Sequence, residues 1–196
     1  MIAGESHALL SNPFESYRRQ HPGLDLQPLD GVDTLCTLSS NHRGYVATFR
    51  IEGRRLLLDD IVTPACGEQA SRSQRRTVFG LDEAVHAAWF TGVLVVPRGE
   101  RVAYAHLGYG SVYQRYRLHR VEKGFVVETA TMAADAYVAY RERQFRIHRT
   151  TQAYRDALAS MLAEGDWSEE DAERFLFLAD TDYATDIALA FEPPMQ

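Results

Sequence analysis

Four polar residues carry the side chains that an acid–base or metal site needs, and all four lie near the ends of expected strands. Asp59 and Asp60 end an apolar run, His86 lies just before a tryptophan, and His106 lies just before a glycine. Carboxylates and imidazoles placed in this way could exchange protons with a substrate or bind a metal ion. No two of them have a metal-binding spacing such as HxH or HExxH, so hydrogen-bonded structural roles are favoured. We therefore expect no metal and no cofactor, and keep an acid–base site at these four residues as the alternative.

Serine and cysteine residues give no nucleophilic motif. Ser111 ends the run Gly108-Tyr109-Gly110-Ser111, but the GxSxG pattern of hydrolases is absent. The same glycines lack the third glycine and the following helix of a dinucleotide-binding loop. Cys36 and Cys66 are the only cysteines, and without an export signal we expect both to be reduced. No catalytic residue follows from these patterns.

Length and composition indicate one globular domain. The chain has 196 residues, of which 45% are hydrophobic and 24% are charged, which is ordinary for a protein with a packed core. No apolar run approaches the roughly 20 residues that cross a bilayer. The first residues have no basic segment followed by an apolar one, as a secretory signal has. We expect a single domain over residues 1–196, in the cytoplasm and not in a membrane.

The middle of the chain predicts antiparallel hairpins. Residues 45–51 alternate and are rich in β-formers, and Glu52-Gly53-Arg54 is a turn that leads into 55–59. Further strands are expected at 35–38, 89–96, 101–106, 112–120 and 125–129. Turns are expected at 97–100 and 122–124, and a polar loop at 63–80. Residues 34–130 therefore form the β-rich core.

Helices are expected before and after this core in the sequence. Asn12 and Pro13 are a capping residue and a first helical residue, which predicts a short helix over 13–20 within an otherwise irregular segment 1–33. Beyond Ala134 the apolar period changes from 2 to 3.6, which predicts one helix ending near Gly165. Ser168 and Asp171 then resemble a capping box that starts a second helix. The predicted class is α+β: an antiparallel, hairpin-built β-sheet (residues ~34–130) followed by two C-terminal helices in segment 131–196.

Charge is segregated along the C-terminal segment. Residues 141–155 hold five Arg and one Glu, a local charge of +4, whereas residues 164–192 hold ten acidic residues and only Arg174, a local charge of −9. Three interpretations are open: the two blocks dock on each other as helices, they provide a surface for a partner, or they are two solvated helix faces. The last is the interpretation that we favour for a charge run in general. A sequence pI near 5.6 and the acidic segment oppose binding to the phosphates of nucleic acids.

Aromatic residues concentrate in the predicted sheet. Tyr109 and Tyr113 lie where the last two hairpins meet, and alternation allows either to face solvent. An exposed Tyr suits protein contacts because it offers a large area at a low cost in conformational entropy. Packing in the core is an equal alternative for both.

An ordered set of motifs runs through residues 40–128. The set comprises Arg43-Gly44-Tyr45-Val46-Ala47-Thr48-Phe49 with Ile51, Leu56–Leu58, Trp89-Phe90-x-Gly92-x-Leu94, Pro97-x-Gly99 and Tyr104-x-His106-x-Gly108-Tyr109-Gly110-Ser111-x-Tyr113. Together these motifs resemble a family of uncharacterised bacterial proteins whose members include immunity-like proteins of interbacterial toxin systems. An acidic residue more often follows the last Tyr in that family, whereas Gln114 stands here. The C-terminal helices lie outside the resemblance.

The resemblance implies a non-enzymatic immunity protein that binds and neutralises a cognate bacterial toxin. An acidic inhibitor associates rapidly with a basic toxin through electrostatic steering, which gives the charge segregation a purpose. The expected partner-binding residues are the two aromatic anchors and six steering charges: Tyr109, Tyr113, Asp166, Glu169, Glu170, Asp171, Asp180 and Asp182. The alternative is a small hydrolase or transferase with a site at Asp59, Asp60, His86 and His106. Sequence alone leaves the oligomeric state and the docking of the basic segment on the acidic one open.

Overall fold

The computed structural model describes residues 6–24, 26, 44–63, 72–105, 109–179 and 186–191. Several sequence predictions lie outside these residues: the strand at 35–38, both cysteines, His106, Asp180 and Asp182. The predicted α+β class is confirmed, since an antiparallel sheet is followed by C-terminal helices.

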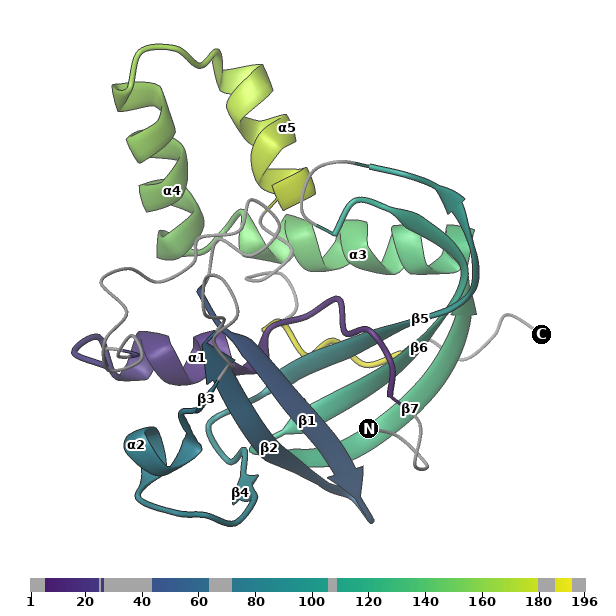
Figure 1. Cartoon of the computed structure of the whole chain (residues 1–196). Helices are drawn as coiled ribbons and strands as arrows, with labels where there is room; N and C mark the ends of the chain where they lie inside the picture. The colour runs from purple at the N-terminus through teal and green to yellow at the C-terminus, as the bar shows by residue number, and fades with distance from the viewer. Residues whose placement is uncertain are drawn as a thin grey trace.

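Seven strands of the described chain form one antiparallel sheet, in the order β1-β2-β7-β6-β5 with β3 and β4 added beside β2. They are β1 (Val46–Glu52), β2 (Arg55–Thr63), β3 (Arg72–Ser73), β4 (Val85–His86), β5 (Gly92–Ala103), β6 (Val112–Glu122) and β7 (Phe125–Ala133). The predicted hairpin turns at 52–54 and 122–124 are both present. β2 meets β7 in register only at Arg55 and Phe125. Because this junction is so short, the β1–β2 hairpin crosses in front of β5–β7 instead of extending them (Figure 1).

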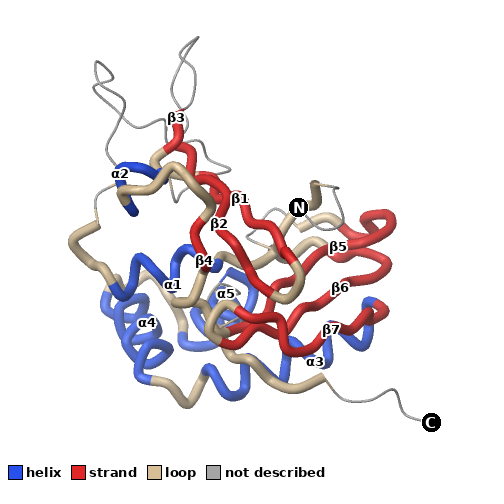
Figure 2. The backbone as a smooth tube through the Cα atoms, turned by 90° about the horizontal axis from the view of Figure 1, so that it is seen from below, coloured by secondary structure: helices blue, strands red, loops and turns tan. Residues whose placement is uncertain are grey.

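The two sides of β5–β7 therefore have separate hydrophobic cores. One core lies beneath the β1–β2 hairpin and α1 (Pro13–Gln20), and includes Phe14, Leu58, Phe90 and Val121. The other lies beneath α3 (Ala134–His148) and includes Val95, Tyr116, Leu118 and Tyr140. Figure 2 shows the resulting order of layers, with β1 and β2 on one side of β5–β7 and α3 on the other.

The described part of the C-terminal segment contains three helices and not the two expected. α3 ends at His148, α4 spans Gln152–Ala163 and α5 spans Glu169–Ala179. The break comes at Thr150 and Thr151, because the extended Thr151 caps the N-terminus of α4 by accepting a hydrogen bond from the Tyr154 amide at 3.2 Å. The apolar period continues across this break, so periodicity alone does not reveal it.

The prediction of a turn at residues 97–100 is wrong. β5 runs unbroken from Gly92 to Ala103, and its register with β6 shifts after Arg98. β5 is the outermost strand, where a proline is tolerated because its missing N–H would face no neighbouring strand. The N-terminal segment lies beside this edge, with the Leu10 amide donating to the Val95 carbonyl at 2.8 Å.

The polar stretch 63–80 is also more ordered than expected where it is described. It contains the short strand β3 and α2 (Arg75–Phe79). Gln74, between them, is buried, and its side-chain amide donates to the Thr63 hydroxyl at 3.0 Å. Pairing with β2 thus holds this segment against the sheet.

Candidate functional site

The basic and acidic segments of the chain dock on each other. Arg149, just after α3, forms an ion pair with Glu173 of α5, and Glu173 also accepts from the Tyr154 hydroxyl of α4 at 3.2 Å. Arg141 of α3 donates to the Phe177 carbonyl at 2.7 Å and lies over its ring, 4.9 Å from the centroid. Arg141 and Arg149 of the basic segment therefore bind residues of the acidic segment of the same chain.

A groove of about 450 Å³ lies between α3 and α5. Two aromatic residues, Phe145 and Phe177, line it, and their rings meet edge to face at 5.0 Å. The rest of its lining carries charges of both signs: Glu142, Arg146, Arg149, Glu170, Glu173 and Arg174. A groove of this kind offers an aromatic surface with an alternating charged rim, as protein-binding surfaces do.

The first turn of α5 is acidic and exposed. Glu169, Glu170 and Asp171 are all exposed, as is Asp166 in the preceding loop. Ser168 caps α5 as predicted: its hydroxyl accepts from the Asp171 amide at 3.1 Å and donates to the Asp171 carboxylate at 2.7 Å. This cap fixes where the helix begins and so where its acidic turn points.

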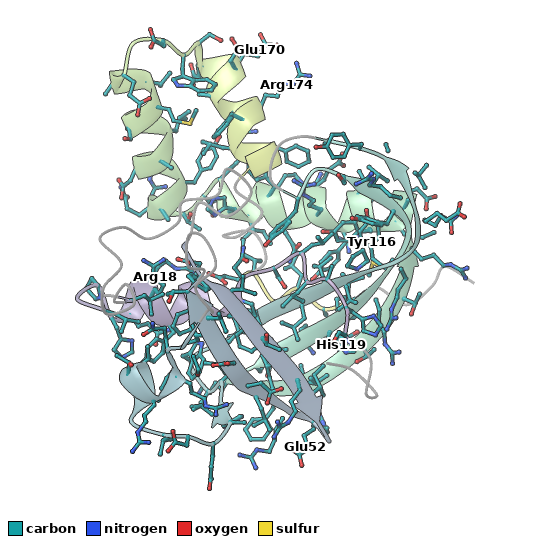
Figure 3. The ribbon with its side chains drawn as sticks, in the orientation of Figure 1. Arg18, Glu52, Tyr116, His119, Glu170 and Arg174 are labelled. Atoms are coloured by element: carbon teal, nitrogen blue, oxygen red, sulfur yellow. The ribbon has the colours of Figure 1, made fainter. Side chains whose placement is uncertain are left out.

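The carboxylates of Glu169 and Glu170 make no ion pair or hydrogen bond within the described part of the chain. Figure 3 shows Glu170 and Arg174 near the outer end of α5, on the side away from α4. We call residues 164–174 the acidic tip; its six carboxylates and one arginine give a net charge of −5.

The two expected aromatic anchors are half-buried and belong to the β5–β6 region. The Tyr109 hydroxyl donates to the Asn12 side chain at 2.8 Å, so Asn12 precedes α1 without capping it through its side chain. The Tyr113 amide donates to the Tyr116 hydroxyl at 2.9 Å, and the two rings meet edge to face at 6.2 Å. Both residues therefore help to hold the protein's own chain together.

The described members of the alternative acid–base site have separate partners. Asp59 pairs with Arg50, and Asp60 accepts from the Ser73 hydroxyl and from the Ile61 amide. His86 hydrogen-bonds the Gly124 carbonyl at 3.1 Å and packs edge to face on Phe125. Because His106 lies outside the described residues, the alternative acid–base site stays a prediction. Within the described residues, no group of three or more His, Cys, Asp or Glu side chains is arranged to hold a metal ion.

Sequence analysis did not identify the groove residues Phe145, Arg146 and Phe177. Phe145 and Phe177 have the spacing of ordinary core positions on two amphipathic helices, and they line one groove only once α5 docks on α3. The available signal was the excess of arginine in residues 141–155 and of acid in residues 164–192, because segments of opposite charge attract each other.

No described helix is long and apolar enough to cross a bilayer. Comparison with known proteins finds no family model, no curated protein and no solved structure that matches this chain.

Proposed function

We propose that this protein is a non-enzymatic, cytoplasmic protein-binding protein, an immunity protein that neutralises a cognate bacterial toxin through its acidic tip. The single observation that carries the proposal is the exposed first turn of α5, where three successive carboxylates are presented by a capped helix. The likeness of residues 40–128 to immunity-like proteins supports the toxin as the kind of partner.

The way in which the tip is built also supports binding. α4 and α5 pack on each other and extend away from the sheet (Figure 1), so the tip is held at the end of a projecting helical pair. Three acidic residues in one helical turn repel each other, and the positive end of the helix dipole offsets only part of that cost. A basic partner would supply the missing countercharge and would be attracted from a distance.

The groove between α3 and α5 would supply the contact area that steering charges lack. Glu170 and Arg174 of the tip line the same groove as Phe145 and Phe177, so a partner held by the tip could also reach the two aromatic rings. Aromatic groups that a partner buries in a groove contribute binding energy, whereas exposed charges chiefly raise the association rate.

The test begins with capture of the tagged protein's partner from its native host, followed by reconstitution with the purified partner. We expect the partner to stop growth when it is expressed alone in a heterologous host, and growth to return when this protein is co-expressed. In stopped-flow binding, Glu169→Gln with Glu170→Gln should slow association by about tenfold at low salt and much less at 0.5 M salt.

Glu83→Gln with Glu100→Gln is the matched control, because it removes two exposed carboxylates that lie outside the tip. This control should associate nearly as fast as the wild type. A captured partner without toxicity would overturn the toxin assignment. Equal slowing by both double variants would overturn the acidic tip as the binding surface.

A further inference from the structure

The side of β5–β7 that faces away from α3 carries a second charged surface, of the opposite sign to the acidic tip. On β6, Arg115, Arg117 and His119 alternate and so share one face, while Tyr116 and Leu118 face α3. Arg98 of β5 stands directly opposite Arg115 in the register. Thr129 and Thr131 of β7 stand opposite His119 and Arg117. We call these six residues the basic shelf.

The shelf is open at one end and covered at the other. Arg115, Arg117, Thr129 and Thr131 are exposed. His119 is only 4% exposed, and the next residue on this face, Val121, is fully buried in the core beneath the β1–β2 hairpin. Figure 3 shows His119 further from α3 than Tyr116, towards β1. His119 therefore marks the inner end of an exposed row of cationic groups.

No described carboxylate pairs with the arginines of the shelf. Arg115 and Arg117 form no ion pair or hydrogen bond with any described residue, and Arg98 donates to His7 Nδ1 at 3.1 Å, which is not an anion. Elsewhere in the fold arginines find carboxylates, as Arg120 does with Glu128 on the other face of β6. Like charges directly opposite each other on a sheet are destabilising, so Arg98 and Arg115 carry a cost that nothing described here offsets.

His119 offers an unused hydrogen-bonding atom at the inner end of this row. Its Nδ1 lies 2.8 Å from the Thr129 hydroxyl, whereas its Nε2 is buried with no partner among the described residues. A buried polar atom without a partner destabilises the folded state, because it has given up its hydrogen bonds to water. Burial, helped by Arg117 and Arg98, lowers the pKa of His119 to about 4, so the ring is neutral near pH 7. The Thr129 hydroxyl can donate to Nδ1, and in that tautomer Nε2 carries the proton and can donate it in a hydrogen bond.

We propose that the basic shelf binds a small oxyanion, namely phosphate or the phosphate group of a small molecule. Arg117 and Arg115 would donate to its oxygens, the Nε2–H of His119 would donate from the inner end, and the Thr131 hydroxyl would donate from β7. Guanidinium groups match the geometry of phosphate oxygens and bind them in pairs of hydrogen bonds. An oxyanion would offset the repulsion between the arginines and satisfy the buried Nε2. This site is independent of the acidic tip and of the proposed toxin.

The test is a titration of the full chain with inorganic phosphate at pH 7.5 and constant ionic strength, followed by NMR. We expect saturable shifts of the His119 ring nitrogens and of the amides of residues 115–119. Arg117→Gln should weaken the phosphate Kd by about tenfold, as the loss of a charge-assisted hydrogen bond does. Arg115→Gln, also at an exposed position, should act in the same direction.

Arg155→Gln is the matched control, because Arg155 is an exposed arginine on α4, away from the shelf. It should leave the phosphate Kd unchanged. The proposal is overturned if sodium chloride gives the same shifts as phosphate, or if Arg155→Gln weakens binding as much as Arg117→Gln does. It is also overturned if an oligonucleotide binds the shelf while phosphate does not.

Glycerol phosphate is the second probe and identifies the source of the oxyanion. Similar affinities for the two probes would assign a free oxyanion. Tighter binding of glycerol phosphate would assign a phosphate ester, and either result supports the site.

Discussion

The ring of Tyr137 on α3 is stacked on the ring of Tyr116 on β6, with centroids 3.9 Å apart and planes 26° apart. Both residues are buried in the core between α3 and the sheet. This pair is one of the contacts through which α3 is held on the sheet, and α3 in turn holds α5 through Arg141 and the adjoining Arg149. The position of the acidic tip therefore depends on aromatic packing well away from it.

Stability should fall at alkaline pH because of this packing. Burial raises the pKa of Tyr137 to about 12, above the value of 10.0 that it has when exposed. The unfolded chain thus loses the phenolic proton before the folded protein does, so the stabilisation is complete below pH 10 and is lost as pH rises towards 12. We expect Tyr137 to account for about 1 kcal/mol of lost unfolding free energy at pH 11.

Urea denaturation of the wild type and of Tyr137→Phe between pH 8 and pH 11 measures this effect. Tyr137→Phe retains the stacked ring and removes the proton, so its unfolding free energy should fall less steeply with pH. Parallel curves for the two proteins would contradict the assignment.

Stability should also fall at acidic pH, because of His119. Its pKa of about 4 lies below the 6.5 of an exposed imidazole. Between these two pH values His119 is therefore protonated in the unfolded chain and neutral in the folded protein. Stability is therefore complete above pH 6.5 and falls as pH drops towards 4, with a loss of about 2 kcal/mol at pH 5.

The comparison is between wild type and His119→Gln, each denatured by urea at pH 7 and at pH 5. The variant should lose about 2 kcal/mol less than the wild type over this interval. Its absolute stability at pH 7 does not enter this difference. An equal loss in the two proteins would show that other groups cause the acid sensitivity.

Gly124 should tolerate a side chain far less well than Gly53, although both have a positive φ, of +77° and +60° respectively. A Cβ on Gly124 would lie 2.7 Å from the Ala87 carbonyl oxygen and 2.7 Å from His86 Nε2, whereas a Cβ on Gly53 would meet nothing within 4 Å. Gly53→Ala should cost about 1 kcal/mol for the left-handed backbone alone. Gly124→Ala should cost at least about 2 kcal/mol more, because the backbone of residues 86–87 must move.

Thermal or urea denaturation of the two alanine variants checks this difference. Gly53→Ala is the internal control, since both glycines lie in hairpin turns. Similar costs for the two substitutions would contradict the close approach of Gly124 to β4.

Ser168→Ala should destabilise the protein by about 1 kcal/mol, the usual cost of losing an N-cap. Ser160→Ala, at an exposed position inside α4, should change the unfolding free energy by less than about 0.5 kcal/mol. Hydrogen exchange should show faster opening of the first turn of α5 in Ser168→Ala. Unchanged protection of that turn would mean that docking on α3 and α4, and not the cap, holds it.

Much of the β-sheet could be predicted because its signals are local. The turn at Glu52-Gly53-Arg54 lies between alternating apolar runs, and Lys123 with Gly124 supplies the two positive φ values of a tight hairpin. Two helix starts could be predicted from equally local signals, one from Asn12 and Pro13 and the other from Ser168 and Asp171. In each case residues near one another in sequence determine the geometry.

Features that depend on distant residues could not be predicted. Pro97 and Gly99 are typical turn residues, and only the position of β5 at the sheet edge makes them compatible with a strand. Nothing around His119 indicates that the β1–β2 hairpin covers its end of β6 while leaving Arg117 exposed. The α3–α5 groove likewise arises from packing between helices that are separate in sequence.

The edge position of β5 also bears on how the protein behaves when it is concentrated. An open strand edge is a template on which another chain can add a strand, and this is a common route to aggregation. Here the outer strand has a proline without an N–H, a glycine at φ +76° and irregular pairing after Arg98, and Leu10 and Ser11 already occupy the Val95 backbone. A second molecule would find few free, evenly spaced hydrogen-bonding groups there, so β5 is a poor starting point for chain-to-chain association.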